Sequence, residues 1–132
     1  MSVTQTNRAL APILLIEDEA SVRAFVRAAL ERRGYRVVQA ATGADGLEAL
    51  SRGTYAGVIS DIRMPGEING ADVHSWIRNH RPELRERMIL ISGDTANSET
   101  QALLSGSRTP CIEKPFRVQQ LISTVETTFG KP

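Results

Sequence analysis

Short runs of apolar residues alternate along the chain with segments whose apolar residues recur at helical spacing. The runs are continuous, as is typical of strands buried on both faces of a parallel sheet. They predict five strands, at residues 13–16, 35–40, 56–60, 88–91 and 110–113. The intervening segments predict five helices, at residues 20–33, 44–52, 71–80, 97–106 and 117–128.

The helical spacing also predicts which side chains face the core. In the first helix these are Val22, Phe25 and Ala29, with Val26 and Leu30 as further candidates. In the last helix the i, i+3, i+4, i+7 pattern selects Val118, Leu121, Ile122 and Val125. We interpret Trp76 as a core residue, and His74 and His80 as surface residues without a set of metal ligands around them.

Strands and helices in strict alternation predict an α/β fold, an open and doubly wound parallel sheet with helices on both faces. Such sheets bind ligands outside the carboxyl ends of their strands. Glu17 and Asp18 follow the first predicted strand, Asp61 follows the third and Lys114 follows the fifth. A buried carboxylate needs partners. This arrangement therefore predicts a site for a divalent cation and a phosphoryl group.

At 132 residues the chain fits one domain. We expect a leader at residues 1–12, a folded domain at 13–129 and a tail at 130–132. The net charge of +1 does not favour nucleic-acid binding, and we interpret Arg81, Arg85 and Arg87 as a solvated face.

Cys111 is the only cysteine, which excludes an internal disulfide and suits the reducing cytoplasm. No apolar run approaches the roughly 20 residues that a membrane-spanning helix needs. The first dozen residues also lack the apolar region of a signal peptide. We therefore expect a cytoplasmic protein with no membrane partner.

Four motifs, in this order, make residues 13–129 similar to response-regulator receiver domains. They are the paired acids after the first strand, the D-x-x-M-P-G motif that begins at Asp61, Ser92 after the fourth strand, and Lys114-Pro115 after the fifth. The resemblance implies a flavodoxin-like (βα)5 fold. It also implies that a sensor histidine kinase or a phosphotransfer protein donates a phosphoryl group to the domain, and that the domain is not an enzyme with a separate substrate.

The resemblance makes Asp61 the phosphoacceptor, and the chemistry agrees, because an ionised carboxylate needs no base but only charge relief as the phosphoryl group arrives. Glu17, Asp18, Asp61 and the backbone carbonyl of Arg63 are the expected ligands of Mg²⁺ or Mn²⁺, since Mg²⁺ prefers oxygen ligands. Lys114 and Ser92 are expected to bind phosphoryl oxygens.

The sequence departs from the family pattern in three places. Glu17 stands where aspartate is commoner; its extra methylene lets it bind the metal through water, which affects affinity rather than binding itself. The loop at residues 64–70 is one residue longer than usual, a variant familiar from receivers of hybrid sensor kinases. Cys111 stands where many receivers have the Tyr or Phe that rotates inward on phosphorylation.

An aromatic switch cannot operate at Cys111, so we expect the output to use Ser92, the Gly93-Asp94 loop and the helix that begins near Asn97. Arg63, Gly93 and Asp94 lie where the family's residues influence the lifetime of the phosphoryl group. Our hypothesis is that Arg63 and Asp94 pair across the mouth of the site and restrict the attacking water.

Two other functions compete with a phosphorylation switch. The first is a docking module that binds partners regardless of phosphate, which the cysteine at position 111 keeps open. The second is a Mg²⁺-dependent phosphatase, but such enzymes usually place a second aspartate two residues after the nucleophile, where Arg63 stands. The kinase, the stimulus, the output partner and the oligomeric state stay open, as does the question of whether the chain is a single-domain regulator.

Overall fold

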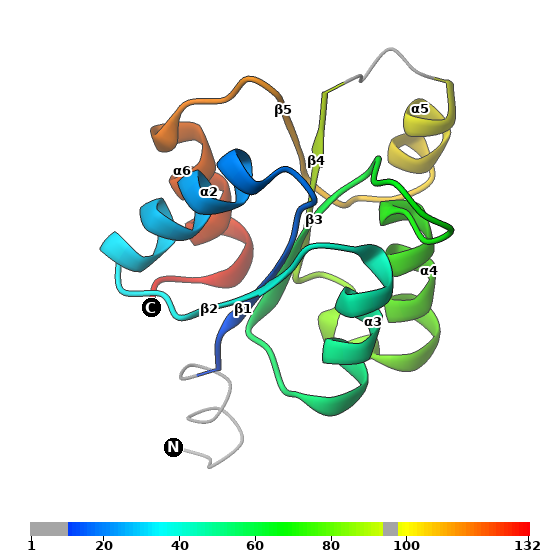
Figure 1. Ribbon diagram of the computed structural model, residues 1–132, viewed down its shortest axis with the longest axis horizontal. Helices are drawn as coiled ribbons and strands as arrows, with labels where there is room; N and C mark the ends of the chain where they lie inside the picture. The colour runs from blue at the N-terminus through cyan, green and yellow to red at the C-terminus, as the bar shows by residue number, and fades with distance from the viewer. Residues whose placement is uncertain (1–10, 94–97) are drawn as a thin grey trace.

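The computed structural model describes residues 11–93 and 98–132, which form one parallel sheet flanked by helices. The strand order is β2-β1-β3-β4-β5 (Figure 1). The strands are β1 (Ile13–Ile16), β2 (Val37–Ala40), β3 (Gly57–Asp61), β4 (Met88–Ser92) and β5 (Cys111–Glu113). The predicted five-stranded, flavodoxin-like α/β architecture is confirmed.

Helices cover both faces of this sheet. Figure 1 shows α2 and α6 on one face and α3, α4 and α5 on the other. Their bounds are α2 (Ala20–Arg32), α3 (Gly43–Arg52), α4 (Gly70–His80), α5 (Ser98–Ser105) and α6 (Val118–Phe129), with a short 3₁₀ turn, η1 (Pro82–Leu84), after α4. Within the described residues, no helix is both long and apolar enough to span a bilayer.

The side chains of β1 contribute to two cores, because successive residues of a strand point to opposite faces. Ile13 and Leu15 pack with the residues of α2 and α6. Leu14 and Ile16 pack on the other face, with residues of α3 and α4. Apolar residues at every position of β1 therefore serve both layers at once.

The helices on the second face begin at defined caps. The side chain of Thr42 accepts a hydrogen bond from the backbone of Asp45 (3.0 Å), and Asn69 and Asp72 form a capping box at the start of α4. A Cβ atom at Gly70 would collide with the backbone of Asp61. The start of α4 therefore lies directly against the end of β3, and this contact fixes the loop that leaves Asp61.

Apart from the start of the second strand, the element boundaries agree with the prediction to within one residue. The second strand begins at Val37 rather than at residue 35. Tyr35 is nevertheless buried, and its hydroxyl donates to the carbonyl of Gly130 (2.6 Å). The fourth predicted helix, α5, begins at Ser98, while Asn97 lies outside the described residues.

The prediction that Phe25 and Val118 face the core is wrong, because their side chains are 43% and 44% exposed. In α2 the buried residues are Val26, Ala29 and Leu30, so that Phe25 lies on the rim beside the buried stripe. Val118 is the first residue of α6, and the buried stripe of that helix begins at Leu121.

The interpretation of His74 as a surface residue is also wrong. Its ring is buried, and Nε2 lies 3.1 Å from the hydroxyl of Thr109. His80 is exposed, as predicted, and stacks on Trp76, which is only half-buried against the core.

Of the three arginines interpreted as a solvated face, Arg85 is exposed, as predicted, but Arg81 and Arg87 have structural contacts instead. Arg81 donates to the carbonyls of Leu50 and Gly53. Arg87 donates to the carbonyls of Ala56 (3.2 Å) and Phe129 (3.0 Å).

Candidate functional site

Asp61 occupies the last position of β3, in the middle of the sheet, where its side chain is buried. The Ser60 hydroxyl donates to the Asp61 carbonyl (2.9 Å), and the backbone N–H of Arg63 donates to Asp61 Oδ1 (3.2 Å). Two backbone-directed hydrogen bonds and the close approach of α4 therefore hold this carboxylate at the carboxyl edge of the sheet.

Lys114 follows β5 and brings its ammonium group to the same edge. Its backbone N–H donates to the carbonyl of Ser92 (2.8 Å), which fixes the start of the loop. Its Nζ lies 2.8 Å from Asp61 Oδ2, 3.0 Å from Glu17 Oε1 and 3.3 Å from Glu19 Oε1. One cation thus serves three carboxylates, so a second cation at this site would be attracted by the remaining negative charge.

Glu17 is fully buried at the end of β1. Its Oε2 accepts a hydrogen bond from the backbone of Glu19 (3.2 Å), whereas Oε1 contacts Lys114 Nζ (3.0 Å) and has no other partner within the described residues. Burial and, secondarily, repulsion from Asp61 raise the pKa of Glu17 to about 7. Burial alone would lower the pKa of Lys114, but its hydrogen bonds to Asp61 and Glu17 outweigh this effect and raise it.

The loop that carries Glu17 is fixed by a cation of the following helix. Arg23 of α2 donates to the carbonyl of Glu17 (2.7 Å) and to that of Asp18 (3.4 Å). The first turn of α2 therefore holds the acidic loop over the sheet edge.

The donor set fits a hard divalent cation. Glu17, Glu19 and Asp61 each offer a carboxylate oxygen, and these oxygens lie within 4.8 Å of one another. Oxygen ligands of this kind suit Mg²⁺, and the buried Oε1 of Glu17 gains a second partner besides Lys114 if a cation binds. Asp18, predicted as a ligand from the sequence, does not belong to this group. Glu19 was missed, although it is the third acid of the Glu17-Asp18-Glu19 run.

The other residues predicted for the site differ in burial, and one of them lies outside the described residues. Ser92 is buried at the end of β4, where its backbone carbonyl holds Lys114. Gly93 is exposed, and among the described residues a Cβ atom there would meet only the side chain of Lys114, at 3.9 Å. Arg63 is exposed beside the site. Asp94 lies outside the described residues, and so does its predicted pairing with Arg63.

Cys111, at the position of the missing aromatic switch, begins β5 and is half-buried against the core. Burial, followed by the charges of Glu113 and Asp61, raises the pKa of its thiol. The side chain is thus a small apolar group in the core rather than a residue able to swing between two positions.

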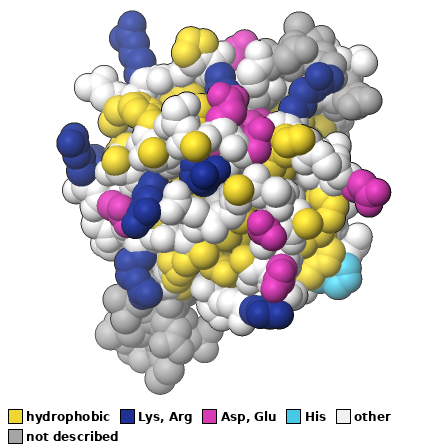
Figure 2. Space-filling view, viewed as in Figure 1, with side chains coloured by type: hydrophobic (Ala, Val, Ile, Leu, Met, Phe, Trp, Pro, Cys, Tyr) yellow, Lys and Arg dark blue, Asp and Glu magenta, His cyan; other side chains and the backbone are white. Residues whose placement is uncertain are grey.

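Figure 2 shows acidic side chains beside a basic one in the upper part of the molecule as drawn, and further charged side chains over the rest of this face. The contacts of Lys114 with Glu17, Glu19 and Asp61 place acids and base at the edge where a parallel sheet binds its ligands.

A family profile described as the response regulator receiver domain matches residues 13–126. Among curated proteins, the chain is similar to the sensor kinase CckA of Brucella abortus, with 33% identity over 123 residues, or 92% of this chain and 13% of the kinase. It is 30% identical to the transcriptional regulatory protein KdpE of Mycobacterium tuberculosis over 119 residues, 90% of this chain and 51% of the regulator. The chain thus spans about half or less of these curated relatives.

Solved structures give the same fold. A receiver domain protein of Methanospirillum hungatei superposes with a TM-score of 0.81 at 23% identity, covering 91% of this chain and 94% of that one. The receiver domain of a Pseudomonas aeruginosa sensor histidine kinase superposes with a TM-score of 0.80 at 24% identity, covering 92% and 98%. That structure has a magnesium ion coordinated in the active site cleft.

Proposed function

Because the chain belongs to the response regulator receiver family, we propose that it accepts a phosphoryl group on Asp61 from a histidine kinase or a phosphotransfer protein. The observation that carries this proposal is the buried Asp61 carboxylate, held 2.8 Å from the ammonium group of Lys114 at the open edge of the sheet. One carboxylate oxygen of Asp61 forms the new bond to phosphorus while the phosphorus–nitrogen bond of the donor histidine breaks.

The surrounding residues have separable tasks in this reaction. Lys114 neutralises charge on the phosphoryl oxygens, and Ser92 offers its hydroxyl to another of these oxygens. Glu17 and Asp61 would hold Mg²⁺ together with Asp18, Glu19 and the carbonyl of Arg63. The bound ion would supply further neutralisation of the phosphoryl charge, which is most of what phosphoryl transfer requires.

Two findings support the metal and the donor. The magnesium ion in the Pseudomonas aeruginosa receiver lies in the cleft of the same fold. The match to a region of the sensor kinase CckA suits a receiver that works with histidine kinases. The protein is then the phosphorylated component of a cytoplasmic two-component pathway or phosphorelay, catalysing only its own phosphorylation and dephosphorylation.

Phosphorylation would shift the protein between two surface conformations without an aromatic switch. The half-buried Cys111 argues for an output through Ser92, Gly93 and the start of α5. The same residue favours the alternative function, a module that docks partners regardless of phosphate.

The experiment that tests this function is intact-mass measurement after incubation with acetyl phosphate, with and without Mg²⁺. We expect the wild-type protein to gain one phosphoryl group only when Mg²⁺ is present, and Asp61→Asn to gain none. No gain in a folded wild-type protein that binds Mg²⁺ would instead support the phosphate-independent docking module.

The lifetime of the phosphoryl group tests the role of Arg63. The backbone N–H of Arg63 donates to Asp61, and its exposed side chain extends from the chain beside the carboxylate. If this side chain shields the phosphoryl group from water, we expect Arg63→Ala to shorten the half-life of the phosphoryl group by about three- to tenfold. The measurement is loss of the phosphoryl mass over time after removal of acetyl phosphate. An unchanged half-life would exclude a shielding role.

A further inference from the structure

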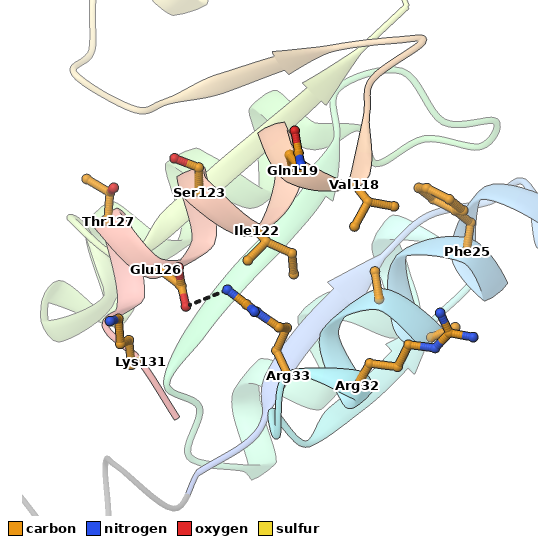
Figure 3. A pocket seen from close by; sticks show the side chains of 12 residues that line it. Phe25, Arg32, Arg33, Val118, Gln119, Ile122, Ser123, Glu126, Thr127 and Lys131 are labelled. Atoms are coloured by element: carbon orange, nitrogen blue, oxygen red, sulfur yellow. Dashed lines mark hydrogen bonds and ion pairs between the residues drawn. The ribbon is translucent and has the colours of Figure 1, made fainter.

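Arginines line two hollows of the molecule that lie outside the candidate site, but their partners differ. One hollow is a groove of about 880 Å³ between α2 and α6, where Phe25 and Val118 are exposed in the lining (Figure 3). Figure 3 shows Arg33 reaching across this groove to Glu126, with 3.3 Å between the two charged groups. The other hollow, at the opposite end of the sheet from Asp61, has arginines without such a partner.

This second pocket has a volume of about 530 Å³, which lies within the range of pockets that hold small molecules. Met88 begins β4 and Pro110 directly precedes β5, so the pocket lies at the amino ends of these strands. Its lining comes from four segments far apart in the sequence: α4, residues 85–88, residues 106–110 and the end of α6. Neither Asp61 nor Lys114 lines it, so the proposed phosphorylation does not account for it.

The lining of the pocket is positively charged. Arg78, Arg85 and Arg108 contribute guanidinium groups, against the single carboxylate of Glu86. Among the described side chains, no carboxylate lies within ion-pair distance of these arginines, and Arg85 only donates to the carbonyl of Arg78 (3.4 Å). The carboxyl ends of α5 and α6 add partial negative charges of roughly half a charge each, which with Glu86 do not cancel three cations. The pocket therefore attracts an anion.

Hydrogen-bonding groups accompany this charge. Four of the lining side chains carry a hydroxyl group: Ser107, Thr109, Thr127 and Thr128. The backbone N–H of Thr109 donates to the Ser107 hydroxyl oxygen (3.3 Å), which orders the loop that carries both residues.

His74 supports one of these hydroxyl groups from the wall of the pocket. Its side chain lines the pocket although the residue is only 6% exposed, and its Nε2 lies 3.1 Å from the hydroxyl oxygen of Thr109. When Nε2 carries the hydrogen, it donates to Thr109 and leaves the Thr109 hydroxyl free to donate to a ligand. A buried side chain therefore positions a donor of the pocket, which distinguishes it from a solvated cluster of arginines.

We propose that this pocket binds a small sugar phosphate, with its phosphate group beside Arg78, Arg85 and Arg108 and its hydroxyl groups beside the serine and threonine side chains. A phosphate monoester carries a charge of about −1.5 to −2 at neutral pH, and guanidinium groups bind its oxygens in a bidentate manner. The cations line one hollow rather than a broad face, which favours a small molecule over a nucleic-acid strand or a membrane surface.

The experiment is an NMR titration of the ¹⁵N-labelled full chain in a chelator, with glucose 6-phosphate, inorganic phosphate and glucose as separate probes. Glucose 6-phosphate is expected to bind with a Kd of about 1 mM or below and to shift the amide signals of residues 106–109 and 127–128. Inorganic phosphate should bind about tenfold more weakly, and glucose should cause no shift.

Three results of the titration would overturn the proposal. One is the absence of saturable binding of glucose 6-phosphate. Another is a set of shifts confined to Asp61 and Lys114, which would place the anion in the candidate site. The third is tighter binding of a tetraglutamate peptide than of glucose 6-phosphate, which would assign the pocket to an acidic protein segment.

Matched charge reversals locate the binding on the protein. Arg108→Glu changes an exposed residue of a loop and is expected to weaken binding of glucose 6-phosphate by at least about tenfold. Arg32→Glu makes the same change in charge at the groove of Figure 3 and should leave binding unchanged. Equal losses in the two variants would mean unspecific attraction and would overturn the proposal.

The positioning role of His74 has its own test. His74→Leu is expected to weaken binding about fivefold, whereas His74→Gln keeps an N–H donor and should restore most of the affinity. Equal weakening in both variants would overturn this role. Asp61→Asn should bind glucose 6-phosphate as wild type does, so the outcome is separate from that of the proposed phosphorylation.

Discussion

Cations lie at both ends of the parallel sheet, but the groups that they bind differ. At the carboxyl edge, Lys114 contacts the carboxylates of Glu17, Glu19 and Asp61. Towards the opposite edge, Arg81 and Arg87 donate to backbone carbonyls near the ends of α3 and α6 and in the segment before β3. Each edge therefore uses its positive charge for a different purpose.

This difference between carboxylate and carbonyl partners indicates that Lys114 belongs to the candidate site, whereas Arg81 and Arg87 stabilise the fold. A carbonyl oxygen has no alternative charge state, so a cation bound to carbonyls fixes loops and has no chemistry to perform. Carboxylates crowded around one ammonium group leave a net negative charge that a metal ion can neutralise, and in the proposed function one of them, Asp61, is the nucleophile. Buried charge of this kind costs stability unless it is fully paired.

The sharpest test of the comparison removes the cation at the carboxyl edge. We expect Lys114→Met to slow phosphorylation of Asp61 by about 10²- to 10³-fold, because a positioned charge that stabilises the transition state is lost. The measurement is the rate of phosphoryl gain from acetyl phosphate by intact mass. Lys131→Met is the matched control, since this exposed lysine lies away from Asp61. A wild-type rate in Lys114→Met would show that the lysine serves structure alone.

Removing a cation from the opposite edge should have the reverse effect. Arg87→Met loses hydrogen bonds to the carbonyls of Ala56 and Phe129, and we expect the free energy of unfolding to fall by about 1–3 kcal/mol. The rate of phosphorylation of the folded variant should stay as in wild type. Urea denaturation measures the first quantity, with Arg52→Met on the exposed face of α3 as the control. A slower phosphorylation with unchanged stability would break the comparison.

A third substitution tests whether the buried carboxylates at the carboxyl edge lower the stability of the metal-free protein. Glu17→Gln removes a fully buried charge that lies beside Asp61, so the metal-free protein should gain about 1 kcal/mol of stability. The same variant should bind Mg²⁺ at least about tenfold more weakly. Urea denaturation in a chelator and calorimetric Mg²⁺ titration measure the two effects. A loss of metal-free stability would mean that the ion pair with Lys114 outweighs burial.

The smallest expected effect concerns His74, on the face away from the site. Burial and, secondarily, the charge of Arg78 lower the pKa of His74 below its ordinary value of 6.5. The unfolded chain therefore takes up a proton at a higher pH than the folded protein, and stability falls as the pH decreases below about 6.5. Urea denaturation between pH 7.5 and 5.5 should show a steeper loss for wild type than for His74→Gln. His80→Gln is the control, and equal slopes in wild type and His74→Gln would contradict the prediction.

The strands and the position of the site were predictable because they depend on local pattern. Short continuous apolar runs that alternate with helical segments are typical of strands covered on both faces, and parallel strands bring their carboxyl ends together. Glu17, Asp61 and Lys114 could therefore be assigned to one edge before any contact was known. Glu19 could not, because its role depends on a side chain that reaches Lys114 from outside the strand.

The mistaken predictions share a different physical cause. Phe25 and Val26 are neighbours separated by only about 100° around the helix axis, and the sheet decides which of them is buried. His74 is buried through its contact with Thr109, which is far along the chain. The carbonyl partners of Arg81 and Arg87 likewise come from segments distant in sequence.

The sequence by itself determined the order of strands and helices, the α/β class and the edge at which acids and lysine meet, because hydrophobic periodicity and strand ends are local properties. The tertiary structure alone decided which cation pairs with carboxylates, which arginines fix loops, and that Phe25 and Val118 wall an exposed groove. Those properties depend on distances between residues far apart in the chain, and only packing sets these distances.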